Sequence, residues 1–382
     1  MSEAPIVILG SGLAGTAVAR ELRKLDAAVP VLLVTADDGD FYSKPNLSNA
    51  LAQKRTPAQL VTTPREALAA QLKIEIRPRI RVARIDVAAH RLEADVGVIG
   101  YRKLVLAVGA QPIRLPIEGD GAADVLSVNH LADYAAFRQK LEGRARVALL
   151  GAGLIGCEFA NDLAGAGYSV DVFDVAPQPL GRLLPVSAAA FFRRGLEAVG
   201  VRFHLGASVE RIDRTDAGYA LIDAAGARTE VDLVMSAVGL RPETALPVMA
   251  GLTANRGIVV DATLATSDTD IYAVGDCAEV QGLVLPFVLP IMQQARALAK
   301  TLAGTPTQVA YPAMPVVVKT PACPTVVCPP PAGLGGAWRE TQDAAGARAV
   351  FEDAAGKPLG FALLGGAMPE KQALASVMPA WL

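Results

Sequence analysis

Two glycine-rich turns in this sequence have the spacing that lets a backbone grip a pyrophosphate. The first is Gly10-Ser11-Gly12-Leu13-Ala14-Gly15, and the second is Gly151-Ala152-Gly153-Leu154-Ile155-Gly156. Glycines in such a turn allow a phosphate to approach the backbone and bind free N–H groups at the start of the following helix. A single turn of this kind is equally typical of a structural strand-to-helix connection. Two of them, each after a short apolar segment, predict two dinucleotide sites.

An acidic residue follows the second turn at the position expected for a ribose ligand. Asp174 lies 18 residues after Gly156 and ends an apolar segment. A carboxylate there accepts hydrogen bonds from ribose hydroxyls and repels the 2′-phosphate of NADPH, and no arginine follows within the next few residues. We therefore expect NADH at the second turn, the alternative being a solvated aspartate at a strand end. In the first unit the same place holds Thr35, which leaves its ribose ligand open.

The elements that must carry these turns form a duplicated pattern of strand, helix and strand. The apolar periodicity predicts strands over 6–9 and 31–35 around a helix over 16–24, and the pattern recurs at 147–150, 157–166 and 170–174. Alternating segments with turn signals predict small antiparallel sheets beside each parallel sheet. These segments are residues 77–86, 90–92, 202–212, 219–223 and 229–233.

The character of the sequence changes after about residue 313. Residues 316–319, 349–351 and 359–364 have strand patterns, residues 321–324 form a proline-bounded turn, and three prolines at 329–331 exclude a central strand. We expect a small α+β domain here, ending in a short helical tail. The fold class is therefore α/β, with two Rossmann-like nucleotide-binding domains and a small third domain.

Charge and composition exclude several classes of function. Lys and Arg number 36 against 38 Asp and Glu, whereas a protein that binds nucleic acid or a membrane surface needs a basic excess. The apolar stretches fall short of the roughly 20 residues of a spanning helix, and the first residues lack the charges of a targeting peptide. Three histidines, none near a cysteine pair, predict no metal site. We expect a cytoplasmic monomer without nucleic acid, membrane or metal.

Three further segments resemble those of the pyridine-nucleotide flavoprotein reductases. Residues 104–112 are similar to the strand and turn between the two nucleotide sites, and residues 234–242 to the segment that closes the NADH domain. Residues 266–277, ending in Gly275-Asp276-Cys277, resemble the second FAD fingerprint of that family. More narrowly, residues 42–48, 151–162 and 316–324 resemble the bacterial NADH:rubredoxin reductases, and more loosely the ferredoxin reductases of oxygenase systems.

The resemblance implies a glutathione reductase-like fold with FAD and NADH as cofactors. The FAD-binding domain would comprise residues 1–115 and 243–312, the NADH-binding domain 116–242, and the C-terminal domain 313–382. The implied NADH residues are Gly151, Gly153, Leu154, Ile155, Gly156, Asp174 and Gly239. The implied FAD residues are Gly10, Ser11, Gly12, Leu13, Ala14, Gly15, Thr35, Ala36, Asp37, Lys44, Val82, Glu158, Asp276, Val288 and Lys319.

Several of these residues take specific roles from the resemblance. Asp276 would bind the ribityl hydroxyls, and Val82 would offer its backbone to the adenine. Val288 would lie against the flavin at the start of a helix over 290–302, and Lys319 would approach the isoalloxazine from the third domain. As the catalytic pair, Lys44 and Glu158 would meet beside the flavin. Without the resemblance, Lys44 fits a loop lysine, Glu158 a helix-start acid and Lys319 an edge-strand charge.

The four cysteines bear on where the electrons go. Disulfide reductases of this fold hold a cysteine pair after the first unit, and residues 41–51 contain none. Cys323 and Cys328 are separated by four residues, but we expect them in a proline-rich turn that does not lower a thiol pKa. With no thiol relay, electrons must leave from the flavin itself, which suits a one-electron carrier.

The resemblance makes rubredoxin the expected carrier, bound transiently, with alkane oxidation as the pathway. Two alternatives stay open, and the first of them shares every cofactor residue with the rubredoxin reductase. One is an NADH:ferredoxin reductase of an aromatic-ring oxygenase system. The other is an NADH-sensing flavoprotein without turnover, as in relatives of apoptosis-inducing factor; the lack of a basic excess argues against a DNA-binding version.

Overall fold

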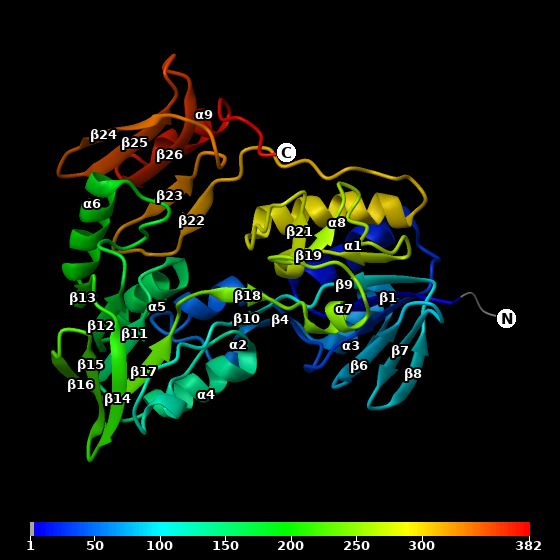
Figure 1. Ribbon diagram of the computed structural model, residues 1–382, viewed down its shortest axis with the longest axis horizontal. Helices are drawn as coiled ribbons and strands as arrows, with labels where there is room; N and C mark the ends of the chain where they lie inside the picture. Colours follow the sequence, from blue (N-terminus) through cyan, green and yellow to red (C-terminus); the bar gives the residue numbers. More distant parts are fainter. Residues whose placement is uncertain (1–3) are drawn as a thin grey trace.

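The first glycine turn follows a fully parallel sheet in the computed structural model, which describes residues 4–382. All four residues of the central strand β1 are buried, as expected for a strand covered on both faces. Helix α1 (Leu13–Leu25) follows the turn and packs against α8 (Val288–Leu302), far along the chain (Figure 1). The strands are β1 (Ile6–Leu9), β2 (Val31–Val34), β5 (Glu75–Arg77), β9 (Lys103–Leu106) and β20 (Ile271–Ala273), in the order β20-β9-β1-β2-β5.

The second glycine turn follows a second parallel sheet. Helix α5 (Leu154–Gly165) begins at this turn and packs on the strands around it. The strands are β11 (Arg146–Leu150), β12 (Ser169–Asp174), β13 (Val201–Leu205) and β17 (Leu233–Ser236), in the order β13-β12-β11-β17. Two antiparallel segments, β10 (Ala110–Pro112) and β18 (Leu240–Pro242), pair where the chain passes between the two sheets.

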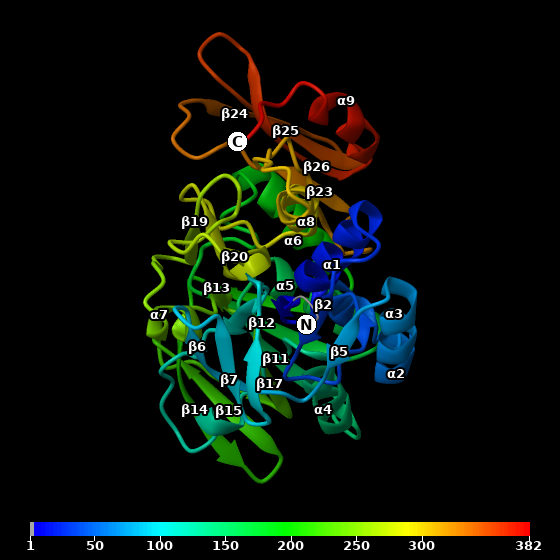
Figure 2. The same ribbon diagram turned by 90° about the vertical axis from the view of Figure 1, so that its right-hand side faces the viewer.

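A five-stranded antiparallel sheet forms one end of the molecule in both views (Figures 1 and 2). Helix α6 (Val186–Glu197) packs between this sheet and β13. An extended segment leads from α8 to its first strand (Figure 1). The elements are β22 (Val316–Val318), β23 (Thr325–Cys328), β24 (Ala337–Gln342), β25 (Gly346–Glu352), β26 (Pro358–Gly365), η4 (Met368–Glu370) and α9 (Lys371–Ala375), with strand order β22-β23-β26-β25-β24.

Smaller elements complete the α/β fold of two Rossmann-like sheets and a small third one. The antiparallel sheets are β6 (Val82–Asp86), β7 (Arg91–Ala94) and β8 (Gly97–Gly100), and β14 (Val209–Thr215), β15 (Gly218–Asp223) and β16 (Arg228–Val231). The others are β3 (Phe41–Tyr42), β4 (Val61–Thr63), β19 (Ile258–Val260), β21 (Ala278–Val280), α2 (Pro57–Leu60), α3 (Arg65–Leu72), α4 (Leu131–Leu141), α7 (Ala245–Met249), η1 (Lys44–Asn49), η2 (Ala122–Asp124) and η3 (Gly275–Cys277). Within residues 4–382, no helix combines the length and apolar character needed to cross a membrane.

Some expected strands belong to different sheets. Residues 202–205 and residue 77 were expected in antiparallel sheets, and this is wrong: β13 and β5 are the edge strands of the two parallel sheets. Both edge strands are only partly buried, so neither has the continuous apolar run that marks the central strands of a parallel sheet. The segment 229–233 divides between β16 and β17, which lie in different sheets. Strands β8, β23 and β24 were not predicted.

A buried carboxylate ties the second unit to the loop after η1. Asp162 of α5 is 3% exposed, and it accepts hydrogen bonds from the backbone N–H groups of Leu51 (2.8 Å) and Ala52 (2.9 Å). A buried carboxylate needs hydrogen-bond donors, and these come from the loop after η1, so the contact holds that loop against α5. The two elements that this contact joins, η1 and α5, both carry predicted site residues, namely Lys44 and Glu158.

Asp162→Ala should lower the free energy of unfolding by roughly 2–4 kcal/mol, because two backbone N–H groups lose hydrogen bonds to a buried carboxylate. Asp343 is a matched control, since its exposed carboxylate also accepts from two backbone N–H groups, those of Ala345 and Gly346. Asp343→Ala should cost about 1 kcal/mol or less. Urea denaturation measures both, and equal losses would contradict the role of burial at Asp162.

Candidate functional site

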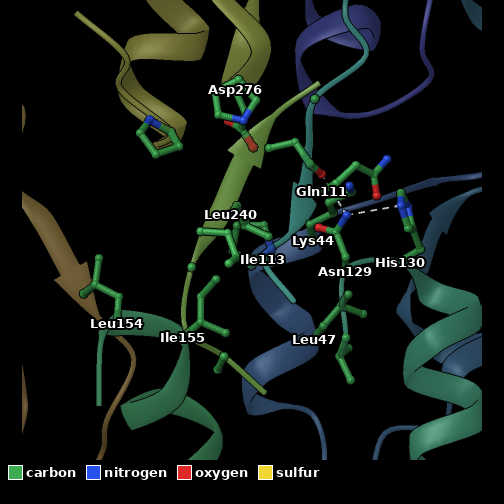
Figure 3. A pocket seen from close by; sticks show the side chains of 18 of the residues that line it. Lys44, Leu47, Gln111, Ile113, Asn129, His130, Leu154, Ile155, Leu240 and Asp276 are labelled. Atoms are coloured by element: carbon green, nitrogen blue, oxygen red, sulfur yellow. Dashed lines mark hydrogen bonds between the residues drawn. The ribbon is translucent and has the colours of Figure 1, made fainter. Parts of the chain in front are cut away.

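Both glycine turns open into one large cavity between the two parallel sheets. Its volume of about 2250 Å³ exceeds the roughly 300–1,000 Å³ of an ordinary small-molecule pocket. Figure 3 shows side chains that line it, among them Lys44, Asp276, Leu154 and Ile155. The predicted residues on its wall are Gly10, Ser11, Gly12, Leu13, Ala14, Thr35, Ala36, Asp37, Lys44, Val82, Gly151, Gly153, Leu154, Ile155, Glu158, Asp174, Gly239, Asp276, Val288 and Lys319.

The two remaining predicted residues, Gly15 and Gly156, do not line the cavity. A Cβ at Gly15 would lie 2.0 Å from the carbonyl oxygen of Gly10, and one at Gly156 would lie 1.9 Å from that of Gly151. These glycines therefore let each helix pack closely on the turn before it. This helix packing is the physical reason for glycine at both positions, and their contact with a cofactor stays a prediction.

The middle glycines of the two turns face open space. Gly12 and Gly153 are the N-cap residues of α1 and α5, and a Cβ at either would meet nothing within 4 Å. The first N–H groups of a helix have no intrahelical partner and carry partial positive charge. Two bare helix starts at one cavity form two cradles of the kind that bind pyrophosphates.

A side-chain network replaces the missing ribose acid of the first unit. Asp37 Oδ1 accepts hydrogen bonds from the hydroxyls of Ser11 (2.8 Å) and Thr35 (2.7 Å). It also accepts from the backbone N–H of Gly39 at 3.0 Å. The structure thus brings a carboxylate from two residues beyond Thr35 to the first glycine turn, leaving Asp37 Oδ2 for a ligand hydroxyl.

Asp174 is connected to the second glycine turn more directly. Its Oδ2 accepts from the backbone N–H of Ala152 at 2.5 Å, and its Oδ1 accepts from Ala176 N–H at 2.7 Å. The carboxylate is therefore oriented at the end of β12, on the cavity wall. Each oxygen retains a lone pair for a ribose hydroxyl.

Lys44 and Asp276 are two oppositely charged, half-buried side chains that line the cavity. Burial lowers the pKa of Lys44, while the nearby carboxylates of Asp276, Asp37 and Asp133 act in the opposite direction. Burial likewise raises the pKa of Asp276, and the charge of Lys44 opposes that shift. The two side chains therefore stabilise each other's charged forms across the space in Figure 3.

The predicted pairing of Lys44 with Glu158 is wrong. Glu158 is 5% exposed and forms an ion pair with Lys319, which follows β22 of the C-terminal sheet. It also accepts from the Ser48 hydroxyl (2.6 Å) and from the backbone N–H of Lys319 (3.0 Å). Sequence separation hid this contact, because only packing of the C-terminal sheet brings residue 319 to α5. Glu158 thereby joins η1, α5 and the C-terminal sheet.

A polar group at the cavity was missed by the sequence analysis. Asn129 donates from Nδ2 to the carbonyl of Ala110 (2.9 Å) and lies 3.2 Å from His130 Nε2 (Figure 3). Burial lowers the pKa of His130, and the charge of Lys44 lowers it further. The sequence around residues 129–130 has no motif that predicts a place on the cavity wall. Gln111, which also lines the cavity, lies in residues 104–112, a segment that resembles the flavoprotein reductases.

The four cysteines are free and buried. Burial raises the pKa of Cys277 and of Cys328 to about 11, so their thiols are held in the unreactive protonated form. Cys328 lies in strand β23, and the expectation of a turn there is wrong because the strand ends just before the prolines. Among residues 4–382, no three metal-ligating side chains come together.

An exposed apolar rim surrounds the cavity on the side of the C-terminal sheet. Val288 and Leu289 at the start of α8 are 43% and 46% exposed, and Val317 of β22 is 47% exposed. All three residues also line the cavity. Exposed apolar residues beside a cavity are typical of a site of association.

Comparisons with known proteins agree with this geometry. Residues 4–301 match the family model described as pyridine nucleotide-disulphide oxidoreductase, and residues 308–378 match the rubredoxin binding C-terminal domain. The chain is 47% identical to the rubredoxin-NAD(+) reductase of Alcanivorax borkumensis over 98% of this chain and 99% of that one. It is also 47% identical to the enzyme of the same name from Acinetobacter baylyi, over 94% of each chain.

A solved structure has the same architecture along nearly the whole chain. It is the ferredoxin reductase for the CYP199A2 system from Rhodopseudomonas palustris, with a TM-score of 0.89 and 27% identity. The match covers 99% of this chain and 96% of that chain.

Lys319→Met should lower the free energy of unfolding by roughly 2–3 kcal/mol, because it leaves the Glu158 carboxylate buried without its cation. We expect less than the full cost of breaking a buried pair because Ser48 still donates to Glu158. The double variant Glu158→Gln/Lys319→Met should recover most of the loss.

Urea denaturation of the three proteins measures these differences. Arg193→Met is the control, because it removes an exposed i,i+4 ion pair with Glu197 and should cost less than about 1 kcal/mol. The interpretation fails if the double variant is no more stable than Lys319→Met.

Proposed function

This chain belongs to the pyridine nucleotide-disulphide oxidoreductase family, and on that premise we propose that it is an FAD-dependent NADH:rubredoxin reductase. The observation that carries the proposal is the single cavity into which both glycine turns open. One wall of this cavity comes from β22, at the start of the rubredoxin-binding domain. Two nucleotides and a protein electron acceptor can therefore meet at one place.

The first glycine turn and its surroundings fit FAD. Gly12 leaves open space for a pyrophosphate at the start of α1, and Asp37 supplies the carboxylate for the adenosine ribose. Asp276 lies deeper in the cavity for the ribityl hydroxyls, with Lys44 beside it. When bound, FAD accepts a hydride from NADH and releases electrons one at a time.

Charged groups and a helix start would favour the reduced, anionic flavin. The N-terminus of α8 at Val288 opens on the cavity, and such a terminus favours an adjacent anion by about 0.3–2 kcal/mol. Lys44, at the start of η1, adds a half-buried positive charge to the cavity wall. The Glu158–Lys319 pair is nearly neutral overall, and we assign it to holding the C-terminal sheet against the cavity.

The second glycine turn fits NADH. Gly153 leaves the start of α5 bare, and the oriented carboxylate of Asp174 lies where it accepts from the ribose hydroxyls and repels a 2′-phosphate. Gly239 lines the cavity next to β18, and its φ of +121° is a backbone conformation that favours glycine.

The apolar rim of Val288, Leu289 and Val317 is the surface proposed to meet rubredoxin. It joins the start of α8 to the domain whose family model is named for rubredoxin binding, and it lies at the cavity edge. A small apolar surface suits a transient electron-transfer encounter. We place the protein in the cytoplasm as a monomer, since four free cysteines fit a reducing compartment, and alkane oxidation remains the suggested pathway.

Ferredoxin is the second candidate acceptor. It is favoured by the likeness to a ferredoxin reductase over 99% of this chain. The cofactor residues are common to both proposals, so only the acceptors distinguish them.

Addition of rubredoxin should stimulate NADH-dependent cytochrome c reduction by the purified holoenzyme at least about tenfold, while ferredoxin should have little effect. Leu289→Glu should reduce this stimulation, because it places a charge on the apolar rim. Val98→Glu is the control, since Val98 is an exposed valine of β8 outside the cavity. Stimulation by ferredoxin but not by rubredoxin would refute the assignment of the acceptor.

Asp174→Asn should raise KM for NADH by about 10- to 100-fold and narrow the preference for NADH over NADPH. The physical reason is the loss of a charged hydrogen bond, worth roughly 1.5–3 kcal/mol. Asparagine is close in size and keeps one acceptor oxygen, which can bind one of the two backbone N–H groups that Asp174 now binds, those of Ala152 and Ala176. Stopped-flow reduction of the flavin by NADH and by NADPH measures the preference. If the ratio of the two rates is the same in Asp174→Asn and in the wild type, another residue sets the preference.

A further inference from the structure

A glutamine buried in α8 makes two hydrogen bonds that its position in the helix does not require. Gln294 is 1% exposed and lies in the apolar core between α1, α8 and the first sheet. Its Oε1 accepts from the backbone N–H of Gly275 at 2.6 Å, and its Nε2 donates to the Tyr311 hydroxyl at 2.8 Å. Because an N–H needs an acceptor, the amide can take only this orientation. A buried amide is costly unless both ends are bonded, so the residue is specific to these partners.

Gly275 begins the turn that carries Asp276. It has φ +80°, and a Cβ there would lie 2.7 Å from Cβ of Ala14 in the first turn of α1. A side chain is therefore excluded, and the backbone N–H is the group through which this residue is held. This N–H donates to Gln294 Oε1, and the hydrogen bond fixes the backbone one residue before Asp276.

Tyr311 in turn is held by the returning end of the described chain. It is fully buried, its carbonyl accepts from Trp381 N–H (2.7 Å), and its own N–H donates to the carbonyl of Leu382 (3.0 Å). Trp381 and Leu382 pack on the core of the first sheet, whereas Met378 belongs to the core of the C-terminal sheet. One short segment therefore connects the C-terminal sheet to Tyr311.

We propose that Gln294 is a positioning residue for Asp276, and that Tyr311 and the returning segment hold Gln294 in the orientation this requires. The inference rests on the proposed function in one respect, namely that Asp276 binds FAD. Seating of the C-terminal domain then contributes to FAD retention through a continuous path of hydrogen bonds. That path runs from Leu382 through Tyr311 and Gln294 to Gly275.

Gln294→Met tests the first step, because it keeps the length of the side chain and removes the acceptor of Gly275 N–H. FAD dissociation from the holoenzyme, followed by flavin fluorescence, should show a Kd about tenfold higher, equivalent to about 1.4 kcal/mol. Gln294→Glu should return the Kd to within about threefold of the wild type, since its oxygen again accepts from Gly275. Gln293→Met, one residue away and half-buried, should bind FAD normally.

Tyr311→Phe tests the second step. It should raise the FAD Kd about threefold alone and add nothing in the Gln294→Met background, because both act through one path. Tyr101→Phe is the control, since it removes a buried hydroxyl that has no hydrogen-bond partner. Circular dichroism checks that each variant is folded.

An unchanged FAD Kd in folded Gln294→Met, or no recovery in Gln294→Glu, overturns the proposal. If Gln294→Met does not fold, equal FAD affinities of Tyr311→Phe and Tyr101→Phe overturn it. All measurements omit rubredoxin, so failure to reduce rubredoxin would refute the proposed function without touching this result. A wild-type protein that does not bind FAD would refute both.

Discussion

A helix start binds a phosphate only where its backbone is bare, and both halves of this structure are built around that requirement. At each turn one glycine lets the helix pack against the turn, and another leaves open space in front of the first N–H groups. The two parallel sheets then face each other so that both bare helix starts open into one cavity. The positions at which these two helices begin determine where the remaining site residues can contact a bound nucleotide.

Charges that are buried near the cavity have partners from other parts of the chain. Lys44 lies near the carboxylate of Asp276, and Glu158 forms an ion pair with Lys319. A buried charge without a partner is strongly destabilising, so the Glu158–Lys319 pair also holds two segments together. The Glu158–Lys319 pair attaches the C-terminal sheet at the place where an electron acceptor would approach the flavin. Asp162 of α5 likewise holds the loop that follows η1, by accepting a hydrogen bond from the backbone N–H of Leu51.

The absence of a reactive thiol is consistent across sequence and structure. The cysteines that the chain does have are buried, and burial raises their pKa values. No reactive thiol is therefore available to carry electrons from the flavin to the acceptor. The apolar rim at Leu289 and Val317 provides the surface through which a one-electron carrier can reach the cavity.

Local patterns in the sequence determined the two strand–turn–helix units and the fold class, and all but two of the predicted site residues line the cavity. Gly12, Gly153 and Asp174 were predicted because their roles depend on neighbours within one unit, and local spacing encodes such neighbours. The partner of Glu158 and the link from Gln294 to Gly275 were decided by the tertiary structure alone. Each of them joins residues that chain folding brings together from different elements, and hydrogen bonds between distant polar groups leave no periodic signal. Asp37 was expected near the FAD ribose from the resemblance, and the tertiary structure added its hydrogen bond from Ser11 of the glycine turn. The edge strands β5 and β13 were assigned to the wrong sheets because the pattern of a short, partly buried segment does not say whether its neighbour runs parallel or antiparallel.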